Sequence, residues 1–77
     1  MRFFLHMRDG DEFIEDLEGI ECGDLAMAHA EAVQGVREIL AERLRQGKVI
    51  DGQKIEIHDE SGHVLESFLF RDVVYLS

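Results

Sequence analysis

The strongest constraint on the fold is the 22-residue proline-free segment 25–46, which lies between an aspartate and a glycine. Asp24 can accept hydrogen bonds from the free N–H groups of a first helical turn, and Gly47 suits the left-handed residue after a helix. Apolar residues recur on one face of the segment with helical spacing. They are Leu25, Ala28, Ala32, Val36, Ile39 and Leu40, with Val33 and Leu44 at the margin. The pattern predicts one long amphipathic helix that covers a sheet.

Segments with the two-residue period of strands flank this helix on both sides. The expected strands are residues 2–8, 13–15, 53–58 and 63–70. The first two surround Asp9-Gly10-Asp11, a strong hairpin signal, and the last two surround the turn 59–62, which ends in glycine. We therefore expect an α+β fold in the order hairpin, helix, hairpin. Its sheet is four-stranded and mainly antiparallel, with the helix on one face.

The length of 77 residues predicts one small domain, 1–77, with a modest core that self-association would stabilise. The apolar tail 73–76 is expected to extend the sheet or to cover a partner subunit. A lone Cys22 and the lack of a signal-peptide or membrane-spanning run indicate a cytoplasmic protein without disulfides.

Negative charge is concentrated in one stretch. Residues 9–24 hold eight acids and no base, so −8 of the formal charge of −9 lies there. The eight are Asp9, Asp11, Glu12, Glu15, Asp16, Glu18, Glu21 and Asp24. Nucleic acid and anionic membrane are disfavoured as partners, because both bind basic surfaces. The stretch either protects a sheet edge from aggregation or attracts a basic partner protein.

Several short sequence motifs occur in a fixed order along nearly the whole chain. They are Phe3-Phe4 with His6-x-Arg8-Asp9-Gly10, Asp16-x-Glu18-Gly19, Asp24-Leu25 with Ala28 and Glu31-Ala32, Arg37-Glu38-Ile39-Leu40-Ala41, Ile50-Asp51-Gly52, Ile55-Glu56-Ile57-x-Asp59-Glu60-x-Gly62, and Phe70-Arg71-Asp72. In this order the chain resembles a family of short bacterial proteins classed as a domain of unknown function. The resemblance implies the same architecture and a bacterial, intracellular setting, and it brings no activity. Gly23 and Gly35 depart from the family pattern, in which proline and a helix former are expected.

Residues 2–46 also resemble the antitoxin partners of toxin–antitoxin pairs that have a small strand-strand-helix domain with an acidic first half. The resemblance does not include the DNA-binding segment that such antitoxins usually carry. An antitoxin-like partner of a small toxin therefore stays as an alternative.

A few individual residues suggest metal binding or thiol chemistry. Asp9-x-Asp11 begins like a calcium loop, but Phe13, Ile14 and Ile20 occupy positions where that loop needs an oxygen ligand, glycine and glutamate. His58 and His63 are expected to face each other across a hairpin. With His6 they are the candidates for a zinc or nickel site, although no metal-binding spacing is present.

The other two candidates have ordinary structural explanations. His29 falls on the apolar arc of the helix, where a backbone partner is expected. Cys22 precedes a helix start among carboxylates, which favour an inert thiol over a redox switch.

We expect a protein-interaction or regulatory module rather than an enzyme, because the sequence contains no nucleophile motif and a chain this small has little room for a catalytic pocket. Phe4, His6, Lys54, Glu56 and His58 are expected on the sheet face opposite the helix, which predicts a homodimer or a partner-binding surface. The predicted interaction residues are Phe4, His6, Asp11, Glu12, Glu15 and Asp16. No cofactor is expected, and a small metal-binding protein is the other alternative.

Overall fold

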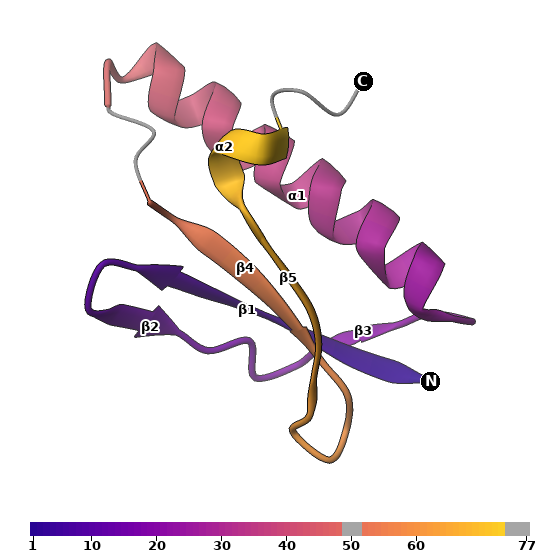
Figure 1. The fold of residues 1–77 in the computed structure, drawn as a ribbon. Helices are drawn as coiled ribbons and strands as arrows, with labels where there is room; N and C mark the ends of the chain where they lie inside the picture. Colours follow the sequence, from indigo (N-terminus) through magenta and orange to yellow (C-terminus); the bar gives the residue numbers. More distant parts are fainter. Residues whose placement is uncertain (49–51, 74–77) are drawn as a thin grey trace.

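The computed structural model describes residues 1–48 and 52–73, and Figure 1 shows their sheet with one long helix across one face. In chain order the elements are β1 (Arg2–Asp9), β2 (Glu12–Ile14), β3 (Ile20–Glu21), α1 (Leu25–Arg45), β4 (Lys54–His58), β5 (Val64–Leu69) and α2 (Phe70–Val73). The predicted α+β layout of hairpin, helix and hairpin is confirmed. The two-residue strand β3 and the one-turn helix α2 were not predicted.

The described strands form one antiparallel sheet in the order β2-β1-β4-β5. β1 pairs with β4 along one edge, and its other edge is shared by β2 and β3 at opposite ends. Leu5 faces Ile57 and Met7 faces Ile55 across the β1–β4 ladder. These residues belong to the core under α1, since directly opposed residues of an antiparallel pair share one face.

Helix α1 begins where the sequence predicts, because Asp24 accepts a 2.9 Å hydrogen bond from the N–H of Met27. It ends one residue before the predicted Gln46, and Gly47 follows with a φ of 71°. Its buried residues are Ala28, Ala32, Val33, Val36 and Leu40. Leu44 is 65% exposed instead of marginal to the core. In this last turn Arg43 reaches β1 instead, with 3.1 Å from its Nη2 to Asp9 Oδ2.

The turn between β4 and β5 closes as predicted, with Gly62 at a φ of 86° and its N–H donating to the carbonyl of Asp59. The expected facing of His58 and His63 is wrong. His58 is opposite Val64, because a bulge shifts the register between Ile57 and His58. β5 therefore starts at Val64, and it stops at Leu69 rather than at Phe70.

The chain leaves the sheet at Phe70, whose N–H donates to the carbonyl of Gln53 at 2.8 Å. α2 then packs between β5 and α1, and it buries Phe70 and Val73 to 2% exposure each (Figure 1). The expectation that the tail extends the sheet or covers a partner is therefore wrong for Val73, which completes the core of its own chain. Residues 74–76 of that expectation lie outside the described residues.

Candidate interaction surface

The sheet face opposite α1 carries polar and aromatic side chains in register. Phe4 is opposite His58, His6 is opposite Glu56, and Arg8 is opposite Lys54. This is the face on which the alternation of the sequence places them. Phe13 of β2 continues the face at its edge, with the guanidinium carbon of Arg8 4.4 Å from the centre of its ring.

Glu56 is the centre of the charges on this face, and its side chain is only 8% exposed. Its Oε2 accepts from Arg8 Nε at 2.8 Å and lies 3.3 Å from Lys54 Nζ, while its Oε1 lies 3.0 Å from His58 Nε2. The hydrogen bond with His58, followed by those with Arg8 and Lys54, outweighs burial and lowers the pKa of Glu56 to about 2. The carboxylate is therefore ionised at neutral pH and fixed in place by its neighbours.

His6 joins this charged array to the segment after β2. Its ring meets that of His58 edge to face, with 4.5 Å between the ring centres. Its Nδ1 accepts a 2.9 Å hydrogen bond from the N–H of Asp16. A nearly parallel Phe4 ring lies 6.2 Å away, so His6 is held on two sides.

The Asp16 carboxylate fixes the loop that follows. It accepts backbone hydrogen bonds from Leu5 at 3.1 Å, Gly19 at 3.1 Å and Glu18 at 3.3 Å. Burial raises the pKa of Asp16, but these hydrogen bonds dominate and lower it below its usual value. Gly19 has a φ of 71°, and a Cβ there would lie 2.7 Å from the carbonyl oxygen of Phe3. The loop therefore packs directly on the backbone of β1.

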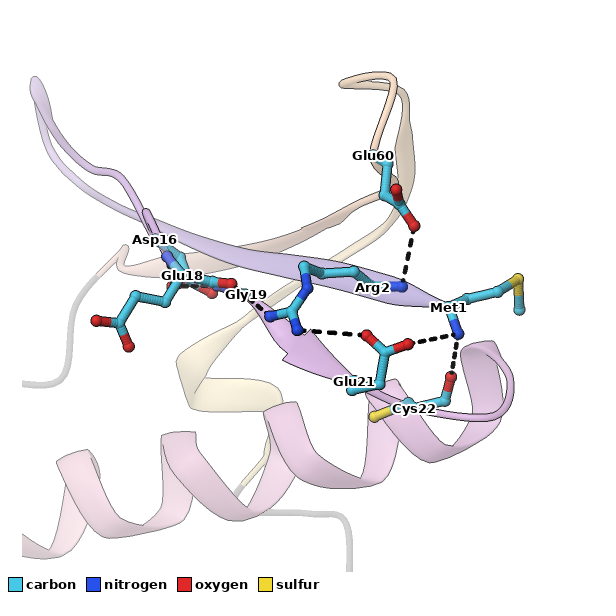
Figure 2. A network of polar contacts seen from close by, with 8 residues as sticks. All are labelled: Met1, Arg2, Asp16, Glu18, Gly19, Glu21, Cys22 and Glu60. Carbon is cyan, nitrogen blue, oxygen red and sulfur yellow. Dashed lines mark hydrogen bonds and ion pairs between the residues drawn. The ribbon is translucent and has the colours of Figure 1, made fainter.

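Figure 2 shows how the start of β1 is held to β3 and to the turn 59–62. The Arg2 guanidinium donates to the carbonyl of Glu18 at 2.7 Å and lies 3.5 Å from the carboxylate of Glu21. The N–H of Arg2 donates to Glu60 Oε1 at 3.2 Å (Figure 2). The loop after β2 and the turn after β4 are thus both tied to β1.

Between these two loops the open face has a hollow of about 240 Å³. Three rings carried by β1 and β4 line it, those of Phe4, His6 and His58. Its lining also includes Leu17, Gly62 and four residues with carboxylates. The carboxylates belong to Glu15, Asp16, Asp59 and Glu60. The hollow therefore combines aromatic rings with concentrated negative charge.

The acidic stretch 9–24 divides into two groups in the structure. Asp9, Asp16, Glu21 and Asp24 hold the fold together through the contacts already described. The second group is exposed and makes no side-chain ion pair or hydrogen bond within residues 1–48 and 52–73. Its members are Asp11, Glu12, Glu15 and Glu18. Half of the stretch is therefore available to a partner.

The histidines proposed as metal ligands have different neighbours. His6 and His58 are adjacent, whereas His63 is exposed on the turn, with 3.2 Å from its Nδ1 to Asp59 Oδ2. In the described parts of the chain, no three His, Cys, Asp or Glu side chains are grouped so that they could hold a metal ion.

The remaining histidine and the cysteine lie away from this face. The His29 Nδ1 contacts the carboxylate of Glu66, and its ring lies beside Phe68. The expected backbone partner of His29 is thus replaced by a side chain of β5. Cys22 is buried at 7% exposure in the core.

Comparison with known families matches residues 2–71 to a domain of unknown function, DUF6894. The chain belongs to the DUF6894 family. No curated protein and no solved structure matches it. Among the described residues of this DUF6894 domain, no helix has both the length and the apolar character needed to cross a bilayer.

Of the predicted interaction residues, Phe4, His6, Glu15 and Asp16 meet at the hollow of the DUF6894 domain. Asp11 and Glu12 lie at the β1–β2 turn, away from it. Sequence reasoning missed Asp59 and Glu60 as part of the same site. Their position in a turn beside β1 follows from the pairing of β1 with β4, which no local pattern specifies.

Proposed function

We propose that this DUF6894 domain is a non-enzymatic protein-interaction or regulatory module that acts as a homodimer and binds a basic segment of a partner protein. The observation that carries this proposal is the hollow on the open face, which is lined by both aromatic rings and carboxylates. The unpaired thiol of Cys22 favours a reducing, cytoplasmic setting, and the family resemblance favours a bacterial one.

An arginine side chain has the chemistry that this hollow would recognise. Its planar guanidinium can stack on an aromatic ring such as that of Phe4 while it donates hydrogen bonds at its edge. Glu15 has no partner among the described residues, and Glu60 uses only Oε1 for the N–H of Arg2. Both therefore keep acceptors for an incoming cation, whereas Asp16 and Asp59 mainly add negative charge.

The surrounding acids would accelerate and strengthen the encounter. Asp11, Glu12 and Glu18 are exposed on the same acidic stretch, and charges of this kind attract an oppositely charged partner over about 10 Å at moderate salt. For Asp11, which precedes β2, and Glu12, its first residue, protection of the sheet edge is the simpler explanation. For Glu15 at the hollow, partner binding is the stronger explanation.

The test uses a fluorescently labelled peptide with four arginines spaced by glycine and serine, and measures its binding by anisotropy. Glu15→Gln with Glu60→Gln keeps the shape of the hollow and removes two charges, and we expect it to weaken binding about tenfold. The matched control is Glu31→Gln with Glu38→Gln, which removes two exposed charges from α1 and should change affinity less than about twofold.

Phe4→Leu separates recognition from simple charge attraction, because it removes the ring without changing the net charge. We expect weaker binding of the arginine peptide and a smaller effect on a lysine peptide of the same spacing. Equal losses in the α1 control and the hollow variant, or no binding by the wild type, would refute the proposed function. Asp16 is not a suitable test residue, because its carboxylate holds the loop in place.

A further inference from the structure

The two outer edges of the sheet differ in length and in charge. β2 has three residues, begins with the exposed acid Glu12 and is flanked by the exposed acids Asp11 and Glu15. Short length and charge are two devices that prevent an edge strand from pairing with another chain. β5 has six residues with Glu66 as its only charged side chain, and no strand of the described residues pairs with its outer edge. Val64 and Leu65 on β5 are 56% and 41% exposed.

The hydrogen bonds of β5 identify which backbone groups point outward. The N–H of Phe70 donates to Gln53, so that directly opposed pair is a hydrogen-bonded one. Such pairs alternate along an antiparallel ladder, so Phe68 with Ile55 and Glu66 with Ile57 are hydrogen-bonded as well. The N–H and C=O groups of Ser67 and Leu69 therefore point away from β4, toward the free edge.

We propose that β5 pairs antiparallel with β5 of a second copy of the chain, with Ser67 on the two-fold axis. This inference rests on the homodimer of the proposed function and gives it a surface. The sheets of the two copies become continuous, and both α1 helices lie on the same side. Ser67 then forms a hydrogen-bonded pair with Ser67 of the second copy.

Charge favours this register and this partner. An axis at Glu66 would place two carboxylates opposite each other, about 4.5 Å apart at Cα. An axis at Ser67 places Glu66 opposite Phe68 of the second copy instead. The acidic stretch lies beyond β1, on the far side of the sheet from β5. With strands about 4.8 Å apart, the two β2 edges end roughly 34 Å from each other, well beyond the screening length.

The test compares masses in solution by light scattering at micromolar concentration. The wild type and Ser67→Ala should have twice the 8.8 kDa mass of one chain, because alanine keeps the outward N–H. Ser67→Pro removes that N–H without removing a bond to β4, and proline is tolerated at such edge positions. We expect it to be monomeric with an unchanged circular dichroism spectrum. A monomeric wild type, or a folded Ser67→Pro dimer, would overturn the proposal.

If Ser67→Pro does not fold, a disulfide crosslink tests whether the β5 strands of two copies pair at Ser67. In a Cys22→Ala background, Ser67→Cys should form a disulfide-linked dimer, because hydrogen-bonded pairs lie about 5.5 Å apart at Cα and disulfides span that distance. Ser61→Cys, on the exposed turn, is the control and should stay monomeric under the same mild oxidation. Absence of the Ser67→Cys crosslink would overturn the register.

The arginine-peptide assay separates this inference from the binding function. Ser67 lies outside the hollow, so monomeric Ser67→Pro should still bind the peptide. A wild type that binds the peptide as a monomer refutes the homodimer together with its β5 interface and leaves the binding proposal standing. A wild-type dimer that does not bind the peptide refutes the binding proposal alone.

Discussion

His6 and Asp16 join β1 to the loop after β2 through hydrogen bonds in opposite directions. The N–H of Asp16 donates to His6 Nδ1 at 2.9 Å, while the Asp16 carboxylate accepts from the N–H of Leu5 at 3.1 Å. Because Nδ1 is an acceptor here, the proton of the neutral ring is on Nε2. The side chain and backbone of Asp16 are thus both committed to β1.

Replacing His6 by leucine should destabilise the domain by about 1–2 kcal/mol, because the N–H of Asp16 loses its acceptor in a partly buried site. His6→Asn places a carbonyl oxygen near the former Nδ1 and should recover part of that loss. Urea denaturation followed by circular dichroism measures both. Equal stabilities of the leucine and asparagine variants would contradict a role for the hydrogen bond.

Glu56 predicts a specific dependence of stability on pH. Its pKa is about 2 in the folded chain against 4.5 when unfolded. A carboxyl with a lowered pKa stabilises the fold fully above its unfolded pKa, and that contribution is lost as pH falls toward the folded value. We therefore expect the free energy of unfolding to decrease from pH 4.5 to pH 2, with Glu56 contributing roughly 1–3 kcal/mol of the change.

Glu56→Gln isolates this contribution from those of other carboxylates. The variant should be less stable than the wild type at pH 7, because Arg8, Lys54 and His58 lose their common anion. The two proteins should become similar in stability near pH 2. A stability difference that stays constant over this range would show that Glu56 acts through packing rather than charge.

Gly19→Ala should destabilise the domain by more than about 2 kcal/mol, because a Cβ would meet the carbonyl oxygen of Phe3 at 2.7 Å in a backbone with positive φ. Gly10→Ala is the control, since Gly10 has a φ of 63° and no atom within 4 Å of a Cβ. It should cost only the conformational penalty, about 1 kcal/mol. Comparable unfolding midpoints for the two variants would contradict the close packing at Gly19.

Gly35→Ala should stabilise the domain by about 0.5–1 kcal/mol. Gly35 lies inside α1, and a Cβ there meets nothing within 4 Å. Alanine lowers the conformational entropy of the unfolded chain and favours the helix. Thermal unfolding should show Tm raised by roughly 4 °C. A lower Tm would contradict the open space around a Cβ at this position.

The sequence was most informative where local chemistry acts alone. Asp24 and Gly47 mark the ends of α1, and alternation assigns Phe4, His6 and Glu56 to one face, because these patterns depend on neighbours along the chain. The β4–β5 bulge could not be predicted, since the turn 59–62 is compatible with His58 facing either His63 or Val64. The bulge leaves Leu65 of β5 without an opposed residue on β4.

The sequence also could not predict which acids of the stretch 9–24 make structural contacts and which stay exposed. Asp9 and Asp11 are both aspartates beside Gly10. Asp9 nevertheless pairs with Arg43 in the last turn of α1, whereas Asp11 has no such partner among the described residues. Likewise, Val73 looks like part of a strand-forming tail. Val73 is helical instead. The hydrogen bond from Phe70 to Gln53 ends the ladder where the chain lies beside α1, and burial of Val73 there outweighs its strand propensity.

The three backbone hydrogen bonds to Asp16 have a consequence for binding thermodynamics. The segment that carries Glu15 and Leu17 is already ordered against β1 in the free chain, so a partner would meet a preorganised rim. Little conformational entropy remains to be lost on association at that rim. A ligand of modest size could then bind with useful affinity on a domain that has only a small area to offer.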